Sequence, residues 1–219
     1  MAPLTQKWKR TEVIVFVIFV VVSLAAWAVW MIRWKAQVAL RDELNALYAI
    51  AGGGDLASVR RLAEYPSPEA IQLIERLAQD RNAFSDSRVE AINVLGARPP
   101  IDSKTLAPLL WIDQPFVVRR AVARVFKQRG CDEGCISATL TALHAIWGGQ
   151  PTVEVRLSAQ IPSPTLHDQE DLVYLHKQTE EDYFVLLNSS ACLARKTLQT
   201  IYGSDSAFVV DIQKKVAPC

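Results

Sequence analysis

Hydrophobic residues fill the first part of the chain without interruption. The twenty residues from Val13 to Ile32 include no charged side chain, and Ser23 carries the one hydroxyl among them. At about 1.5 Å per residue, a helix of this length covers the roughly 30 Å hydrocarbon core of a bilayer. Since a helix pairs its backbone polar groups internally, we predict a transmembrane helix at 13–32 that follows a basic tail at 1–12.

The flanking charges bear on the orientation of this helix. Three basic residues precede the apolar run and three follow it closely, so the charge distribution barely favours either direction. A short basic tail before a first apolar helix commonly starts export, which favours a cytoplasmic amino terminus and an extracytoplasmic remainder. The alternative is a cleaved signal peptide with its small-residue site at Ala26-Trp27-Ala28. The apolar stretch that continues from Val29 to Ile32 favours a retained span.

The helical pattern continues beyond the apolar run. Four apolar residues recur at three- and four-residue steps: Leu40, Leu44, Leu47 and Ala51. No glycine or proline intervenes before Gly52-Gly53-Gly54, so we predict a helical stalk at 33–51 that is continuous with the span and ends at the glycines. Asp55 is expected to cap the next helix.

Short amphipathic segments, separated by Pro, Gly, Asp or Ser, make up the next part of the chain. They lie at residues 55–64, 68–80, 86–96, 103–111, 114–129 and 133–147. Helices of this kind cannot bury their apolar faces alone, so they are expected to stack as hairpins. The prediction is a mainly α domain over residues 55–219.

An internal period accompanies these segments. Val59-Arg60, Ser87-Arg88 and Val118-Arg119 open similar phrases, and their arginines are 28 and 31 residues apart. In the second and third phrases an acid precedes the helix, small residues lie midway, and a large apolar residue follows the arginine by seven. A repeated helical unit is therefore indicated.

These phrases resemble the second helices of HEAT-type repeats, whose pattern is an acid, then Val-Arg, then Ala, then Leu-Gly. The similarity covers roughly residues 55–147. It implies a right-handed α-solenoid of helical hairpins and a role as a protein-binding or structural scaffold. It also implies that Arg119 pairs with an acid of a neighbouring turn, either Asp86 or Asp113. Three residues depart from the pattern: Pro66, Ser87 and Val122.

After residue 151 the hydrophobic pattern changes from a helical period to a period of two residues. Apolar and polar residues alternate from Thr152 to Ile161, as in a half-buried strand. A partner strand at Leu172–Leu175 would complete a small β-ribbon insert within residues 152–176, although a helical turn fits Leu172–Leu175 equally well. Helices are expected to resume over 180–202 and 206–216.

Charge and cysteine content narrow the class of protein. The chain has 24 basic and 23 acidic residues, and residues 1–35 hold five basic and one acidic, so the remainder carries a net charge of −3. That balance does not indicate a nucleic-acid partner. Four cysteines permit disulfides in an exported domain. Cys131 with Cys135 and Cys192 with Cys219 is one of three pairings, and free thiols are an equal alternative.

One helix is strongly basic. It carries Arg119, Arg120, Arg124, Lys127 and Arg129. Lipid phosphates or an acidic protein could bind there, and a solvated helix face is the simpler interpretation. We take Arg120, Arg124 and Lys127 as the candidate interaction surface.

The sequence gives only weak indications of a metal-binding or catalytic site. Cys131, Cys135 and His144 suggest a metal site, but the thiols lack the usual two-residue gap and a fourth ligand. His167 and His176 lie in an acidic stretch that could bind a cation. The sequence has neither a Gly-x-Ser-x-Gly phrase nor a Gly-rich phosphate loop, so it predicts no catalytic residue and no cofactor.

The function predicted from these patterns is that of a single-pass membrane protein. Its partners are the lipid bilayer and another protein, for which its helical repeats form an interaction scaffold or an assembly factor. A membrane-tethered metal sensor or enzyme, using the Cys131/Cys135 turn or the His167/His176 loop, is the alternative. Self-association through residues 1–54 into a homo-oligomer is a third hypothesis.

Overall fold

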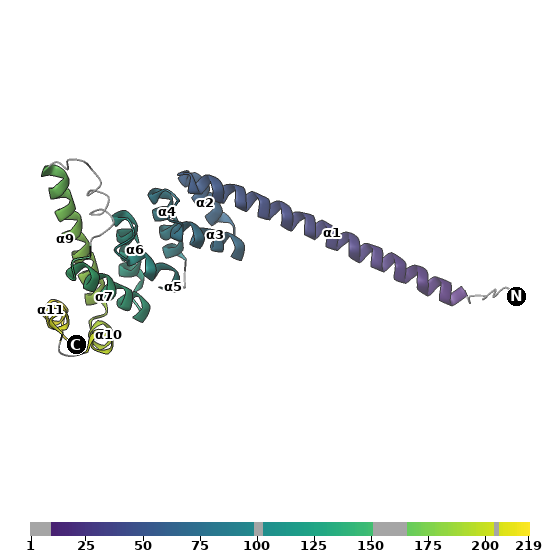
Figure 1. The fold of residues 1–219 in the computed structure, drawn as a ribbon. Helices are drawn as coiled ribbons and strands as arrows, with labels where there is room; N and C mark the ends of the chain where they lie inside the picture. The colour runs from purple at the N-terminus through teal and green to yellow at the C-terminus, as the bar shows by residue number, and fades with distance from the viewer. Residues whose placement is uncertain (1–9, 99–102, 151–165, 204–205) are drawn as a thin grey trace, which may run out of the picture. The chain divides into compact units, whose positions relative to one another are not determined.

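The computed structural model describes residues 10–98, 103–150, 166–203 and 206–219 (Figure 1). These residues form helices joined by short turns and contain no strand. The prediction of a mainly α protein is therefore confirmed for the described part of the chain. The first helix, α1, runs from Arg10 to Gly52, and the later elements are α2 Leu56–Glu64, α3 Pro68–Gln79, α4 Ser85–Ala97, α5 Ser103–Leu106, η1 Ala107–Leu110, α6 Phe116–Arg129, α7 Glu133–Trp147, α9 Leu166–Ser189, α10 Ala191–Tyr202 and α11 Ala207–Lys215.

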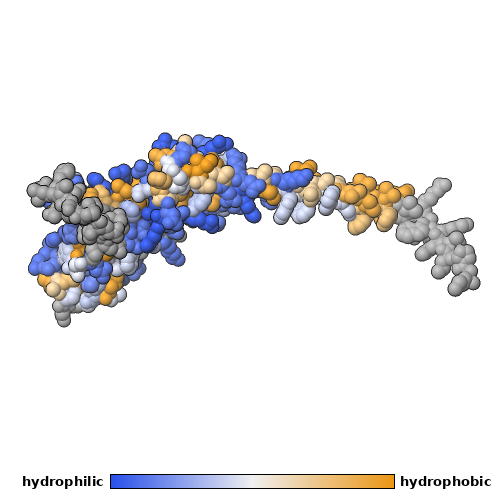
Figure 2. All heavy atoms as spheres, turned by 45° about the horizontal axis from the view of Figure 1, so that its top comes forward, coloured by the Kyte–Doolittle hydropathy of each residue, from blue (hydrophilic) through white to orange (hydrophobic). Residues whose placement is uncertain are grey.

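Helix α1 has the length and composition needed to cross a bilayer. It is 43 residues long, and the large apolar side chains from Ile14 to Trp34 are exposed along it. Figure 2 shows these hydrophobic side chains on the outside of the helix. The predicted continuity of apolar run and stalk is confirmed, because one uninterrupted helix contains both.

The chain divides into two compact units, residues 1–46 and residues 47–219. Helix α1 ends within the second unit at the glycine triplet, where Gly54 has a φ of +105°. This is the left-handed region that glycine adopts without strain, as expected for a helix terminator. The Asp55 carboxylate accepts hydrogen bonds from the backbone N–H groups of Ala57 and Ser58, which confirms Asp55 as the cap of α2.

The helices of the second unit pack against one another both as sequence neighbours and across intervening helices. Helix α4 packs against α2, α3 and α6, and α6 packs in turn against η1 and α9. Helix α7 contacts η1, α9 and α10. The shared core consists mainly of aliphatic residues with no exposed surface: Val59, Leu62, Ile74, Leu77, Ile92, Leu110, Val118, Val122, Ile136, Leu140, Leu143, Leu186, Leu187 and Leu198.

A glycine allows α4 and α6 to approach closely. A Cβ atom on Gly96 would lie 2.5 Å from Cγ2 and 2.8 Å from Cγ1 of Val125. Non-bonded carbon atoms prefer separations of about 3.5–4.0 Å, so a side chain at residue 96 would push the two helices apart. The glycine that closes the second repeated phrase is thus a packing requirement.

The three arginines of the repeated phrases have different environments. Arg88 and Arg119 are each 2% exposed, whereas the Arg60 side chain is 66% exposed and pairs with Glu90 at 2.6 Å. Arg88 Nε donates to the Ala78 carbonyl at 3.1 Å, and Arg119 Nη1 donates to the Ile112 carbonyl at 3.2 Å. The buried arginines therefore satisfy carbonyl groups in the segments just before their own helices.

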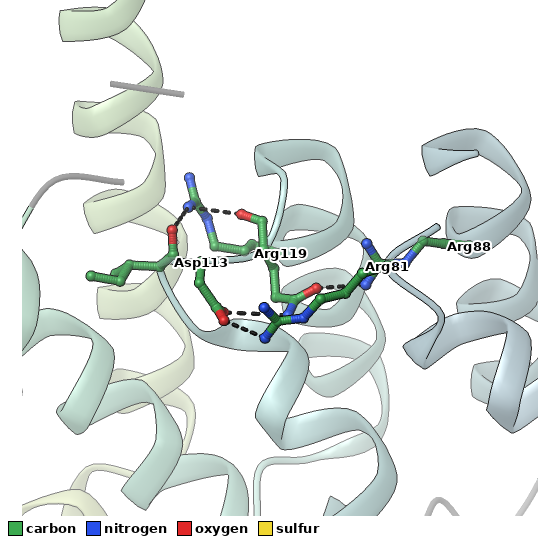
Figure 3. Close-up of polar contacts among 6 residues, drawn as sticks. Arg81, Arg88, Asp113 and Arg119 are labelled. Atoms are coloured by element: carbon green, nitrogen blue, oxygen red, sulfur yellow. Dashed lines mark hydrogen bonds and ion pairs between the residues drawn. The ribbon is translucent and has the colours of Figure 1, made fainter. Parts of the chain in front are cut away.

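Gln114 connects the two buried arginines. Its side-chain Oε1 accepts a hydrogen bond from Arg88 Nη2 at 2.5 Å, and its backbone carbonyl accepts one from Arg119 Nη1 at 3.1 Å. Asp113, one of the two acids that the repeat resemblance offers to Arg119, is paired with Arg81 (Figure 3). Arg119 Nη2 also donates to Thr179 Oγ1 of α9 at 3.3 Å. A buried polar chain thus extends from Ala78 to α9.

Of the two alternatives for Leu172–Leu175, the helix is confirmed and the strand is wrong. Leu172–Leu175 lies inside α9, and the Thr179 hydroxyl donates to the Leu175 carbonyl at 2.8 Å, as a helical threonine does. Four apolar residues are too few for periodicity to separate a strand from a helix, and α9 begins at Leu166 rather than near Glu180. The alternating residues 152–161 lie outside the described part of the chain.

Candidate functional site

The basic residues of α6 divide into two groups. Arg119 is buried in the polar chain described above. Arg129 donates from Nε to the Gly96 carbonyl at 3.0 Å and from Nη2 to the Ala97 carbonyl at 3.1 Å, so it satisfies the end of α4. Both residues are structural. Arg120, Arg124 and Lys127 remain, and these are the residues that the sequence pattern indicated.

A groove forms where these three residues meet α9. Arg120, Arg124 and Lys127 follow one another at helical steps of four and three, so they share one side of α6. Together with Ala123 of α6 and with Asp182 and Val185 of α9, they line a pocket of about 180 Å³. We call these six residues the basic groove. Its walls are charged, while Ala123 and Val185 supply apolar surface.

One acidic residue belongs to the basic groove. Asp182 Oδ2 lies 3.8 Å from Arg120 Nε, and the Arg120 guanidinium also lies 5.8 Å from the centre of the Phe116 ring. Burial raises the pKa of Asp182, and the nearby Glu181 adds to the rise, while Arg120, Lys127 and Arg124 oppose it. The three cations are therefore close enough to act on one carboxylate, and the groove carries a net charge of +2 when Asp182 is ionised.

Two of the three cations are not neutralised within the described residues. Arg120 has Asp182 as a partner, but no hydrogen bond or ion pair joins Arg124 or Lys127 to another residue in those ranges. A guanidinium and an ammonium group that lie side by side favour carboxylate or phosphate oxygens.

Cys131 and Cys135 do not form a thiolate pair in this structure. A disulfide joins them, with their Cα atoms 5.4 Å apart, and both residues are buried. In this form the turn offers no thiolate to a metal ion. His144 contacts rings instead: it stacks on Tyr202 at 4.9 Å and meets the edge of Phe208 at 4.9 Å.

The second histidine region also makes ordinary contacts. His176 Nε2 lies 3.5 Å from Glu180 Oε1, and the same oxygen accepts a hydrogen bond from Trp147 Nε1 at 2.8 Å. His167 lies in α9, but its side chain is outside the described part of the structure. Among the residues whose side chains are described, no three His, Cys, Asp or Glu residues gather in a way that could hold a metal ion.

The sequence pattern indicated the basic residues of α6 that line the groove, but it did not indicate the α9 residues. Asp182 and Val185 are three residues apart within a segment that the sequence predicted to be helical, so their shared face could have been recognised. Which helix that face meets depends on the path of the chain between α7 and α9. Local periodicity contains no information about that path.

The chain matches no protein-family model, no curated protein and no solved structure. Its function is therefore inferred from its own residues.

Proposed function

We propose that this chain is a single-pass membrane protein whose helical unit, residues 47–219, is a HEAT-like scaffold that binds a protein partner through the basic groove. The observation that carries the proposal is a pair of cations, Arg124 and Lys127, that have no hydrogen bond or ion pair within the described residues and that line a pocket with apolar surface. We infer an acidic, partly apolar segment of another protein as the ligand, since carboxylates match the cations and aliphatic groups match Ala123 and Val185.

Membrane anchoring is supported by the composition of α1. Its apolar side chains are exposed to a degree that water-soluble helices avoid, and bilayer lipid is the environment that suits them. The Cys131–Cys135 disulfide supports an extracytoplasmic location for the helical unit, because disulfides persist in oxidising compartments. In this proposal the amino terminus is cytoplasmic.

A HEAT-like arrangement is supported by one correspondence between two repeated phrases and by one glycine contact. Arg88 and Arg119 occupy equivalent places, and each donates to a carbonyl of the segment before its helix. Gly96 closes the second phrase at the contact with α6. Scaffolds of stacked helices bind partners along the surfaces that neighbouring helices form together, and the basic groove is such a surface.

Photo-crosslinking from the groove tests the proposal. A photoreactive amino acid replaces Val185, which is 40% exposed and lines the groove, in the full chain in its native membranes. We expect one discrete crosslinked protein, and we expect mass spectrometry to place the crosslink in an acidic segment of it. The paired substitutions Arg124→Glu and Lys127→Glu should abolish the product.

Two matched controls accompany the experiment. The same photoreactive residue at Val173, which lies on α9 outside the groove and is 70% exposed, should give no such product. Lys196→Glu reverses a charge on the exposed side of α10 and should leave the product unchanged. A crosslink to lipid, to a second copy of the chain or to a neutral segment would contradict the proposed partner.

A further inference from the structure

The end of the described chain is fastened to α10 by an arginine. Arg195 Nε donates to the Ala217 carbonyl at 2.9 Å, and Arg195 Nη2 donates to the carbonyls of Val216 at 2.6 Å and Gln213 at 2.8 Å. One guanidinium thus binds three carbonyl groups, in the last turn of α11 and directly after it. Hydrogen bonds from a charged donor are stronger than neutral ones, so the segment has a defined position.

An asparagine holds the same segment from the other side. Asn188 Oδ1 accepts a hydrogen bond from the Ala217 backbone N–H at 2.7 Å. Ala217 is therefore held through both its N–H and its carbonyl, by residues that lie four positions before and three positions after Cys192. Cys192 and Arg195 are neighbours on one face of α10, as residues three apart in a helix are.

This fastening brings a second cysteine to Cys192. Cys219 follows Ala217 by two residues, and two extended residues reach about 7 Å at most. The neighbouring Cys192 thiol raises the pKa of the Cys219 thiol. Both cysteines are exposed, so a soluble reagent can reach them.

We propose that Cys192 and Cys219 are the site of a second disulfide, which locks the segment after α11 onto α10. The two thiols lose two protons and two electrons, and the disulfide form of a protein thiol–disulfide oxidoreductase accepts the electrons. One cysteine thiolate attacks the oxidant to form a mixed disulfide and release one thiol. The other thiolate then attacks the mixed disulfide and releases the second thiol, so the oxidant leaves reduced.

The Cys131–Cys135 disulfide supports this site, and it also creates the alternative disulfide pairing that the experiment must exclude. Cys131 and Cys135 are already joined in the same helical unit, and an environment that keeps their disulfide also oxidises exposed thiols. The Ser190 hydroxyl donates to the Cys131 carbonyl at 3.1 Å, so α10 begins beside that disulfide. An exchanged link from Cys192 to Cys131 must therefore be distinguished from the proposed one. The inference does not depend on the basic groove or its partner.

Peptide mapping of the full chain in detergent tests the proposal. The protein is incubated with an oxidised thiol–disulfide oxidoreductase, alkylated and digested with trypsin without reduction. We expect the peptide 178–195 linked to the peptide that begins at Val216, with about 2 Da less than the sum of the two free peptides. Cys192→Ser and Cys219→Ser should each remove the linked peptide and leave the remaining thiol alkylated.

The fastening residues provide a test that keeps both sulfur atoms. Arg195→Ala should slow formation of the link by about tenfold, because the two thiols lose their high effective concentration. Lys196→Ala, a neighbouring exposed change on α10, should leave the rate unchanged. Alkylation of both thiols after oxidation, a link from Cys192 to Cys131 or Cys135, or equal rates for Arg195→Ala and the unaltered chain would overturn the proposal.

Discussion

Arg88 donates a hydrogen bond to Gln114 across 26 residues of sequence, with Nη2 and Oε1 separated by 2.5 Å. Both residues are buried, and burial lowers the pKa of Arg88, with the positive charge of Arg81 adding to the effect. The guanidinium keeps its charge because Nε and Nη2 donate hydrogen bonds and because Asp80 and Asp113 favour the cation. This contact fastens α4 to the turn that begins α6.

Replacing Arg88 should therefore be costly. Arg88→Ala would leave the Gln114 side chain and the Ala78 carbonyl without their buried donor, and it would open a cavity, so we expect a loss of about 3–5 kcal/mol. Arg60→Ala is the matched control, because Arg60 occupies the equivalent place in the first repeated phrase but is exposed, and its loss should cost far less. Pulse proteolysis of the full chain in urea measures both. Equal losses would contradict the structural difference between these arginines.

The contact between Gly96 and Val125 makes a second prediction. Gly96→Ala should destabilise the chain by about 1–3 kcal/mol, because the new methyl group overlaps both methyl groups of Val125. Val125→Ala alone also destabilises the chain, but in the double variant it should offset part of the cost of Gly96→Ala. A double-mutant cycle by urea unfolding measures this coupling, and strictly additive losses would contradict the contact. Gly52→Ala, which meets no atom within 4 Å, serves as the control.

Asp182 should make stability depend on pH. Burial raises the pKa of Asp182, so the folded chain binds a proton more tightly there than the unfolded chain does. The stability that this proton gives is present at low pH and is lost as the pH rises from the ordinary carboxyl range through the raised pKa. Asp182→Asn should thus make the chain more stable at pH 7, by less than about 1 kcal/mol because three cations offset the burial, and should bring no gain at acid pH. An equal gain at every pH would show that ionisation of Asp182 is not the cause.

Reduction of the Cys131–Cys135 disulfide should weaken the fold modestly. The two cysteines are only four residues apart, and closing so short a loop accounts for about 2 kcal/mol. The measurement compares urea unfolding with and without a phosphine reductant in a chain that carries Cys192→Ser and Cys219→Ser. The same reductant should have no effect once Cys131 and Cys135 are both replaced by alanine. A large effect in that chain would mean that the reductant acts elsewhere.

Local patterns in the sequence predicted the helices well. The glycine triplet ends α1, Asp55 caps α2, and the helical segments between residues 55 and 147 occur within a few residues of their predicted bounds. These features depend on neighbours within about one helical turn, which a single sequence displays directly.

Contacts between distant residues were not predictable in the same way. Arg60, Arg88 and Arg119 occupy equivalent places in the three repeated phrases, yet Arg60 is exposed and the other two are buried. The difference arises because Gln114 lies close enough to bind both Arg88 and Arg119. Gln114 stands before a proline, and nothing in that local sequence predicts that it binds two arginines. The contribution of Asp182 to the basic groove could not be predicted for the same reason, because it depends on how the chain places α9 against α6.

Retention of the anchor is tested by the mass and location of the chain after membranes are washed with alkaline carbonate. A retained membrane anchor predicts a chain of the full 24.4 kDa in the membrane pellet, released only by detergent. A shortened chain that begins after Ala28, or a full-length chain in the carbonate supernatant, would contradict it.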